Sequence, residues 1–181
     1  MRIHLVTGGV RSGKSRHAGE QARALGGDAV TYVATARAVD EEMRRRIERH
    51  RAERPSTWVT REAPRDAHLA IRDATTPVVL LDCLTVLLAN ALDAVGPLDE
   101  SEALEAMAGE TARLLSAATA RDGHLIVVTN EVGCGIHPET AVGRWFRDGL
   151  GNANRCLAAE AEDVALLVAG LPLALKVSGA G

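Results

Sequence analysis

The sequence predicts an α/β fold in which a mainly parallel β-sheet is covered by helices on both faces and residues 1–181 form one domain. Two observations lead to this expectation. Short runs of apolar and β-branched residues alternate with longer amphipathic segments, which is the pattern of parallel strands joined by crossover helices. The first apolar run also leads through a glycine-rich stretch directly into a helical pattern, as in loops that bind phosphate.

In the first half of the chain, each element has a local signal. Apolar runs mark buried strands, and the acidic run 40–42 marks the first turn of a helix, where negative charge stabilises the helix dipole. The apolar run 78–81, which ends on Asp82, is the clearest strand. We expect strands at Ile3–Val6, Val30–Ala34, Thr57–Glu62 and Pro77–Asp82, and helices at Ser15–Leu25, Asp40–Glu53, Arg65–Asp73 and Thr85–Ala94.

The second half continues the alternation after a break at Gly96 and Pro97. The longest amphipathic pattern predicts a helix over Glu100–Ala120. We then expect a strand at His124–Thr129, a loop at Asn130–Pro138, a helix at Thr140–Glu162, a strand at Val164–Val168 and an antiparallel edge strand at Leu173–Val177. Strands and helices that alternate in this way to the end of the chain indicate three layers.

Composition and charge exclude several classes of protein. The net charge of -3, the pI near 6.1 and the aromatic content of 2% provide neither a basic field nor stacking platforms for nucleic acid. Cys83, Cys134 and Cys156 lack a C-x-x-C spacing, which argues against a disulfide framework and a zinc site. No apolar run approaches the ~20 residues of a membrane span, and Met1 leads straight into the first strand without room for a signal peptide. We therefore expect a cytoplasmic protein.

The stretch from Gly8 to Ser15 carries the clearest chemical signal. Gly8, four free positions and then Gly13-Lys14-Ser15 match the phosphate-loop pattern. Glycines let successive backbone N–H groups point at phosphate oxygens, and the following helix adds the positive end of its dipole. Lys14 can reach the β- and γ-phosphates, while the Ser15 hydroxyl can join the ligands of a Mg²⁺ ion. The other lysine is Lys176, so a lysine at the loop, in a chain rich in arginine, favours a specific use of its compact charge.

Asp82 and the loop Asn130–Pro138 both follow predicted strands, at the end where open parallel sheets bind ligands. The carboxylate of Asp82 is placed to hold Mg²⁺ directly or through water, and the alternative is an acidic residue that simply starts a loop. The loop contains glycines, so it is either part of a site or a structural turn.

His50 lies late in the predicted helix Asp40–Glu53, on the same face as Met43 and Ile47. Spacing alone favours a partly buried structural histidine beside solvated arginines. The other interpretation is a nucleophile, because a neutral imidazole can attack a nucleotide α-phosphate and form a covalent phosphoramidate. Nearby guanidinium groups would stabilise the charge of the transition state. The arginines that flank this face are Arg46, Arg51 and Arg54.

Several motifs together resemble one known family, that of the bifunctional adenosylcobinamide kinase / adenosylcobinamide-phosphate guanylyltransferase. They are T-G-G-V-R-S-G-K-S-R at residues 7–16, Y-V-A-T-A at 32–36, H-R-A-E-R-P at 50–55, L-L-D-C-L-T at 80–85 and T-N-E-V-G at 129–133. The phosphate loop by itself is unspecific, but its combination with H-R-x-x-R-P and T-N-E-V-G is highly specific. The similarity runs in order over nearly the whole chain.

The resemblance implies a three-layer, RecA-like P-loop fold, assembly as a trimer, and two reactions. The family phosphorylates adenosylcobinamide with ATP or GTP. It then transfers GMP from GTP to adenosylcobinamide phosphate through a covalent histidine–GMP, giving adenosylcobinamide-GDP and pyrophosphate. By position, His50 matches the histidine that takes GMP. The phosphate-loop pattern assigns Lys14 to catalysis and Ser15 to Mg²⁺, and the position of Asp82 at a strand end assigns it to the same ion.

The nucleotide site that the resemblance implies draws on both loops and helices. The triphosphate would be held by Gly8, Gly9, Val10, Arg11, Ser12, Gly13, Lys14, Ser15 and Arg16. The guanine nucleotide would be contacted by Thr35, Ala36, Arg37, Arg51, Ala52, Glu53, Arg54, Glu62 and Asp82. The chain departs from some relatives near this site, because Arg49 precedes His50 where they have a second histidine. Asp82 likewise stands where some of them have glutamate.

Two other functions are kept beside this one. The first is a simple small-molecule kinase, in which His50 is only structural. The second is a RecA-like, ATP-driven module that acts on nucleic acid, which the acidic and aromatic-poor composition disfavours. We therefore expect the partners to be adenosylcobinamide, ATP and GTP, rather than nucleic acid or a membrane.

Overall fold

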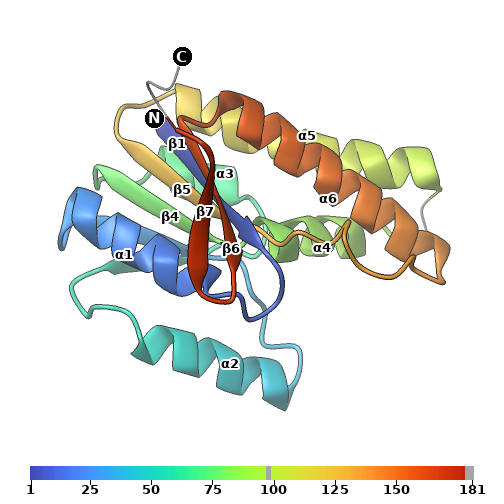
Figure 1. Ribbon diagram of the computed structural model, residues 1–181, viewed down its shortest axis with the longest axis horizontal. Helices are drawn as coiled ribbons and strands as arrows, with labels where there is room; N and C mark the ends of the chain where they lie inside the picture. The colour runs from blue at the N-terminus through green and yellow to red at the C-terminus, as the bar shows by residue number, and fades with distance from the viewer. Residues whose placement is uncertain (97–98, 178–181) are drawn as a thin grey trace.

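The computed structural model describes residues 1–96 and 99–177, and within them a seven-stranded sheet forms the centre of the molecule (Figure 1). The strands, in the spatial order β3-β2-β4-β5-β1-β6-β7, are β3 (Val59–Glu62), β2 (Val30–Ala34), β4 (Val78–Asp82), β5 (His124–Val128), β1 (Arg2–Gly8), β6 (Asp163–Val168) and β7 (Leu171–Lys176). The helices are α1 (Lys14–Gly26), α2 (Glu41–Ala52), α3 (Ala67–Arg72), α4 (Leu84–Val95), α5 (Glu100–Thr119) and α6 (Ala141–Glu160).

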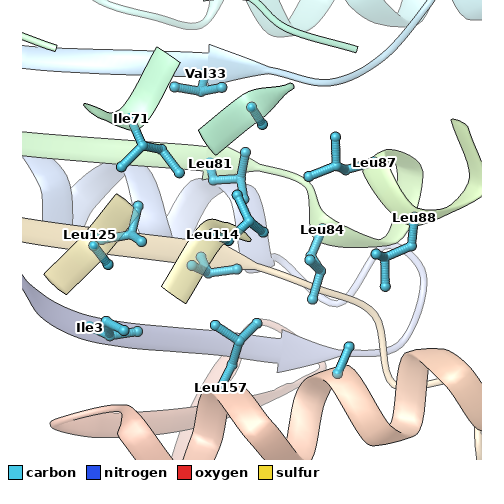
Figure 2. Close-up of a cluster of buried hydrophobic side chains, with 14 of the residues drawn as sticks. Ile3, Val33, Ile71, Leu81, Leu84, Leu87, Leu88, Leu114, Leu125 and Leu157 are labelled. Atoms are coloured by element: carbon cyan, nitrogen blue, oxygen red, sulfur yellow. The ribbon is translucent and has the colours of Figure 1, made fainter. Parts of the chain in front are cut away.

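Helices cover both faces of the sheet (Figure 1). Helix α1 packs on one face, over a core that includes Leu80 and Ile126. Helices α3 to α6 cover the opposite face, over a larger core to which the neighbouring strand residues Leu81 and Leu125 belong (Figure 2). Successive side chains of a strand point to opposite faces, so a sheet covered on both sides needs continuous apolar runs such as 78–81.

Strands β1 to β6 run parallel, and β7 closes one edge of the sheet in the antiparallel direction. The register aligns the carboxyl ends of three strands, since Asp82 is paired with Val128, which is paired with Val6. The end of β4 and the loop after β1 therefore meet at the same edge of the sheet. This is the edge at which open parallel sheets bind their ligands.

The predicted elements are confirmed, with ends that differ by one or two residues. Helix α2 begins at Glu41 because Asp40 caps it, accepting a hydrogen bond from the Met43 N–H at 2.7 Å. Strand β7 begins at Leu171 because the turn before it, with positive φ angles at residues 169 and 170, is tighter than expected. Pro97, part of the predicted break, lies outside the described residues.

Candidate active site

The loop between β1 and α1 requires glycine at two positions. Gly8 has a φ of 150° and Gly13 a φ of 95°, which L side chains rarely adopt. A Cβ atom on Gly8 would also lie 2.5 Å from the carbonyl oxygen of Leu167 in β6. On the same side, the Gly170 N–H donates to the Ser12 carbonyl at 3.0 Å. The β6–β7 hairpin therefore packs against the phosphate loop and forms a hydrogen bond with it.

Lys14 is buried at the start of α1, and its ammonium group donates to the Gly9 carbonyl at 2.6 Å. Burial lowers the pKa of Lys14 below its usual value, while the Coulombic effects of Cys83 and Asp82 act in the opposite direction. The Ser12 hydroxyl is buried and has no hydrogen-bond partner among the described residues. The loop thus holds a lysine and a free hydroxyl that a phosphate group can engage.

Asp82, at the end of β4, forms a chain of contacts with Tyr32 and Arg54. Its Oδ2 atom accepts a hydrogen bond from the Tyr32 hydroxyl at 2.6 Å. Burial, reinforced by the charge of Asp82, holds the pKa of Tyr32 well above its usual value, so this phenol remains a donor. The guanidinium carbon of Arg54 lies 3.4 Å from the centroid of the Tyr32 ring, a cation–π contact.

Thr35 joins the ends of β2 and β4. Its side chain is buried, and its hydroxyl donates to the Cys83 carbonyl at 2.9 Å and accepts from the Cys83 N–H at 2.8 Å. The Thr35 carbonyl in turn accepts from the side-chain amide of Asn90 in α4 at 2.9 Å. These bonds position the segment that carries Asp82. Burial also raises the pKa of the Cys83 thiol to about 11, so the thiol is neutral near pH 7.

A hollow of about 310 Å³, which we call the strand-end hollow, lies between α2 and the carboxyl ends of β2, β3 and β4. It brings together residues that are far apart in the sequence. Those among the residues that the resemblance implies are Ser15, Thr35, Ala36, Arg37, His50, Arg51, Arg54, Glu62 and Asp82. Arg46 lines it as well. Several guanidinium groups thus surround a space bordered by the end of the phosphate loop, which suits an anionic ligand.

A second hollow of about 630 Å³, which we call the interhelix hollow, lies between α1 and α2. Ser15, Tyr32, His50 and Arg54 line both hollows, so His50 stands where the two meet. The predicted helix face is confirmed, because Met43 and His50 are partly buried together with Ile47 while the rest of α2 is exposed. This partly buried face thus places His50 at the border of the two hollows.

Other implied residues lie apart from the strand-end hollow. Glu53 and Arg16 line only the interhelix hollow, and Ala52 is exposed and is not among the residues that line either of the two. Arg11 is exposed in the phosphate loop, as is Val10, with 78% of its surface accessible. The implied residues are therefore distributed over the two hollows and the phosphate loop, and Ala52 borders neither hollow.

The loop after β5, whose role the sequence left open, supports the phosphate loop. The Glu131 N–H donates to the Gly8 carbonyl at 3.0 Å, and the Asn130 N–H donates to the Thr85 hydroxyl of α4 at 2.8 Å. Sequence reasoning also missed Tyr32 as the partner of Asp82. The available signal was a lone tyrosine within an aliphatic strand, where its hydroxyl needs a partner when it is buried.

Comparison with known proteins gives matches over nearly the full length of the chain. Residues 4–175 match the CobU family model, described as cobinamide kinase / cobinamide phosphate guanyltransferase. The bifunctional adenosylcobalamin biosynthesis protein CobU of Salmonella typhimurium is 42% identical over 182 residues, covering 95% of this chain and 98% of that protein. The bifunctional adenosylcobalamin biosynthesis protein CobP of Pseudomonas aeruginosa is 41% identical over 174 residues, covering 95% and 96%.

Among solved structures, a prototypical ATPase from the type III secretion system of pathogenic bacteria aligns with a TM-score of 0.57 and 13% sequence identity. The alignment covers 96% of this chain and 56% of that one. This likeness concerns the fold alone, and with the sheet order it confirms the expected three-layer P-loop fold. No helix in residues 1–96 and 99–177 is long and apolar enough to cross a membrane.

The family model and the extent of identity to the curated relatives show that this chain belongs to the bifunctional cobinamide kinase / cobinamide phosphate guanyltransferase family.

Proposed function

We propose that this chain carries out two successive reactions at the site formed by the phosphate loop, α2 and the end of β4. The first transfers the γ-phosphoryl group of ATP or GTP to the aminopropanol hydroxyl of adenosylcobinamide. The second transfers GMP from GTP to the new phosphate, releasing pyrophosphate and forming adenosylcobinamide-GDP. Membership of the family supports both reactions. The proposal adds that GMP passes through a covalent bond to His50.

The observation that carries this proposal is the position of His50. It lines the same hollow as Ser15 and Asp82, and in residues 1–96 and 99–177 no other histidine lines either hollow. A purely structural histidine would not need to border the end of the phosphate loop. Arg46, together with the arginines of the H-R-x-x-R-P motif, provides positive charge around the same space, as the transfer of a phosphate group requires.

Guanylyl transfer through His50 consists of two displacements at the α-phosphorus. First, a neutral ring nitrogen attacks, the N–P bond forms, and the bond from phosphorus to the bridging oxygen breaks, so that pyrophosphate leaves with the electron pair. Second, a phosphate oxygen of the acceptor attacks the same phosphorus, and the electron pair of the P–N bond returns to the ring. The other ring nitrogen keeps its proton throughout. In the kinase reaction the substrate hydroxyl loses its proton to water and attacks the γ-phosphorus directly, while the bond from that phosphorus to the β–γ bridging oxygen breaks and ADP or GDP leaves with the electron pair.

Mg²⁺ is the cofactor expected for both reactions, and the residues present fit it. Ser15 provides a hydroxyl next to the phosphate loop, and Asp82 has one carboxylate oxygen outside its bond to Tyr32. The described residues contain no cluster of three or more His, Cys, Asp or Glu side chains that could enclose a metal ion. A few protein oxygens combined with substrate phosphates are the usual ligands of Mg²⁺. When bound, the ion would neutralise phosphate charge.

The deciding experiment is to incubate the protein with GTP labelled on the α-phosphate and measure acid-labile label on the protein. We expect labelling of the unmutated chain, and its complete loss in His50→Ala together with the loss of guanylyl transfer. Phosphorylation of adenosylcobinamide should continue at a reduced rate, because that reaction needs no protein nucleophile. His17→Ala, on α1 and outside both hollows, is the control and should label normally.

The simple kinase remains the second candidate, and the same assay separates the two. Absence of label on the unmutated chain, with normal phosphorylation of adenosylcobinamide, would favour the kinase. Full labelling of His50→Ala would show that GMP is attached elsewhere and would overturn the assignment of the nucleophile.

We also infer that the chain forms a homotrimer, as the resemblance implies. The edge strand β7 and the strand end before it expose a row of large apolar side chains, each with more than half of its surface accessible, namely Val168, Leu171, Leu173, Leu175 and Val177. An exposed apolar edge strand is a ready surface for another copy of the chain. Light scattering should therefore give a trimer mass that Leu173→Glu reduces, while Val142→Glu, at a similarly exposed position on α6, should not. An unchanged mass for Leu173→Glu would place the interface elsewhere.

A further inference from the structure

The interhelix hollow is larger than the strand-end hollow. Part of its wall, which includes Gly19, Glu20, Arg23 and Trp58, has no nucleotide contact among those implied above. The hollow begins at Ser15 and Arg16 and follows one face of α1 past Gly19 and Arg23. Figure 1 shows α1 and α2, the two helices that border it. Its floor includes the buried ring of Trp58, whose indole N–H donates to the Gly27 carbonyl at 3.0 Å. The hollow is thus a formed space with a fixed floor that opens beside the phosphate loop.

The chemistry of guanylyl transfer, on which this inference rests, restricts where the acceptor can bind. In-line displacement places the attacking and leaving atoms on opposite sides of the phosphorus. His50 therefore attacks opposite the pyrophosphate, which lies along the phosphate loop. The acceptor must later attack opposite His50, from the position that pyrophosphate has left. In the kinase reaction too, the acceptor hydroxyl must meet the γ-phosphorus at this loop. Both reactions thus require the reacting end of the acceptor beside the loop.

We propose that the interhelix hollow binds the acceptor, adenosylcobinamide or its phosphate, in both reactions. The strand-end hollow is lined by most of the implied nucleotide residues outside the phosphate loop, so guanosine would occupy it. A third hollow, lined in part by Arg61 and Arg65 near α3, contains neither His50 nor a residue of the phosphate loop. The interhelix hollow contains both His50 and Ser15. The reacting end of the acceptor can therefore lie at Ser15 while the rest of the molecule follows α1.

The walls of the interhelix hollow suit such a ligand. Arg16 lies at the loop end, where its guanidinium nitrogen is 3.4 Å from the position of a Cβ on Gly170, and its charge offsets that of the acceptor phosphate. Further along, Glu20 and Arg23 offer an acceptor and a donor for the amide groups that surround a corrin ring. The aromatic floor gives the apolar edge of the ligand a flat surface. A few charged groups around a mainly apolar floor are the usual combination in sites that bind small molecules.

Gly19 allows the proposal to be tested by filling the hollow. A Cβ atom at Gly19 would meet nothing within 4 Å, so a larger side chain points into open space and also improves helix propensity. In Gly19→Leu we expect kcat/KM for adenosylcobinamide and for its phosphate to fall about tenfold or more, because the leucine occupies ligand space. The rate of GMP labelling by GTP alone should stay within about twofold. Gly19→Ala should cause a smaller loss.

Gly151→Leu is the matched control, since Gly151 is an exposed helical glycine in α6 with nothing within 4 Å of its Cβ position. It should leave both reactions and the labelling unchanged. Normal use of both acceptors by Gly19→Leu would overturn the proposal, and so would a slowed labelling reaction, since the hollow would then hold nucleotide. If the unmutated chain takes no label from GTP, the proposed function fails first, and this inference fails with it.

Discussion

At the residue scale, Asp82 has one carboxylate oxygen engaged by Tyr32, whose ring also stacks on Arg54. The buried tyrosine therefore holds a carboxylate and a guanidinium in fixed positions on two sides of the strand-end hollow. Thr35 fixes the backbone that follows Asp82 through its two bonds to Cys83. The orientation of Asp82 thus depends on two residues. Tyr32 in β2 binds its side chain, and Thr35, directly after β2, binds the backbone of the next residue, Cys83.

Asp82→Asn tests whether this carboxylate holds Mg²⁺. The amide is similar in shape but neutral, so we expect kcat/KM for both reactions to fall by about 10- to 100-fold, with partial recovery at raised magnesium. Steady-state kinetics across a magnesium titration measures this. Tyr32→Phe is the comparison, because it retains the charge, and its smaller loss should not respond to magnesium. If magnesium has no effect on Asp82→Asn while the preference for GTP over ATP changes, Asp82 contacts the base or sugar instead.

At the scale of elements, the start of β5 depends on Gly123, which has a φ of 110°. A Cβ atom there would lie 2.2 Å from the carbonyl oxygen of Pro77. That carbonyl accepts a bond from the His124 N–H at 2.8 Å, and the Gly123 carbonyl accepts one from the Arg2 N–H at 2.7 Å. The glycine therefore allows β4, β5 and β1 to begin in register with one another.

Gly123→Ala should lower the free energy of unfolding by about 1–3 kcal/mol, because a strained backbone conformation is combined with a clash against a carbonyl group that cannot easily move. Urea denaturation followed by circular dichroism measures the change. Gly151→Ala, at an open helical position, is the control and should raise the free energy of unfolding by up to about 1 kcal/mol. Equal stability of the two variants would mean that the turn before β5 relaxes without strain.

At the scale of the whole molecule, a chain of hydrogen bonds links three adjacent strands at the edge of the sheet opposite the phosphate loop. Arg2 in β1 contacts His124 Nε2 at 2.7 Å, His124 Nδ1 contacts His4 Nε2 at 2.8 Å, and His4 Nδ1 contacts Asp163 Oδ2 at 2.5 Å. Arginine can only donate, so His124 Nε2 accepts, and each imidazole then donates to the next group. Both imidazoles are neutral in this arrangement.

Stability should therefore fall in acid. Burial chiefly, and then the neighbouring Arg2 and His4 side chains, hold the pKa of His124 below its usual value, against the opposing influence of Glu162 and Asp163. In the unfolded chain His124 binds a proton near pH 6.5, whereas in the folded chain it binds one only at lower pH. The contribution of neutral His124 to the free energy of unfolding is therefore complete above about pH 6.5 and is lost as the pH falls through the lower pKa of the folded state. Urea denaturation between pH 7.5 and 5.5 should show the free energy of unfolding decrease with falling pH, and this decrease should be smaller in His124→Gln. An equal decrease in that variant would assign the effect to other groups.

Local signals were sufficient for most of the fold and for part of the site. The positive φ angles at Gly8 and Gly13, the apolar run before Asp82 and the acidic turn that starts α2 each depend on residues close in sequence. Backbone sterics, periodicity and helix capping act over that range, so the composition of a short segment determines its local structure. The phosphate loop and the face of α2 that carries His50 were predicted for this reason.

The contacts between segments were decided only by the tertiary structure. Sheet order places β5 between β1 and β4, so the loop after β5 reaches the Gly8 carbonyl, and the turn at Gly170 reaches Ser12. The same packing joins Tyr32 to Asp82 and places His50 between two hollows. Which strands become neighbours depends on the burial of apolar surface over the entire chain, and no local pattern encodes it. Local sequence thus determined the groups available for chemistry, whereas the order of the strands determined which of them meet.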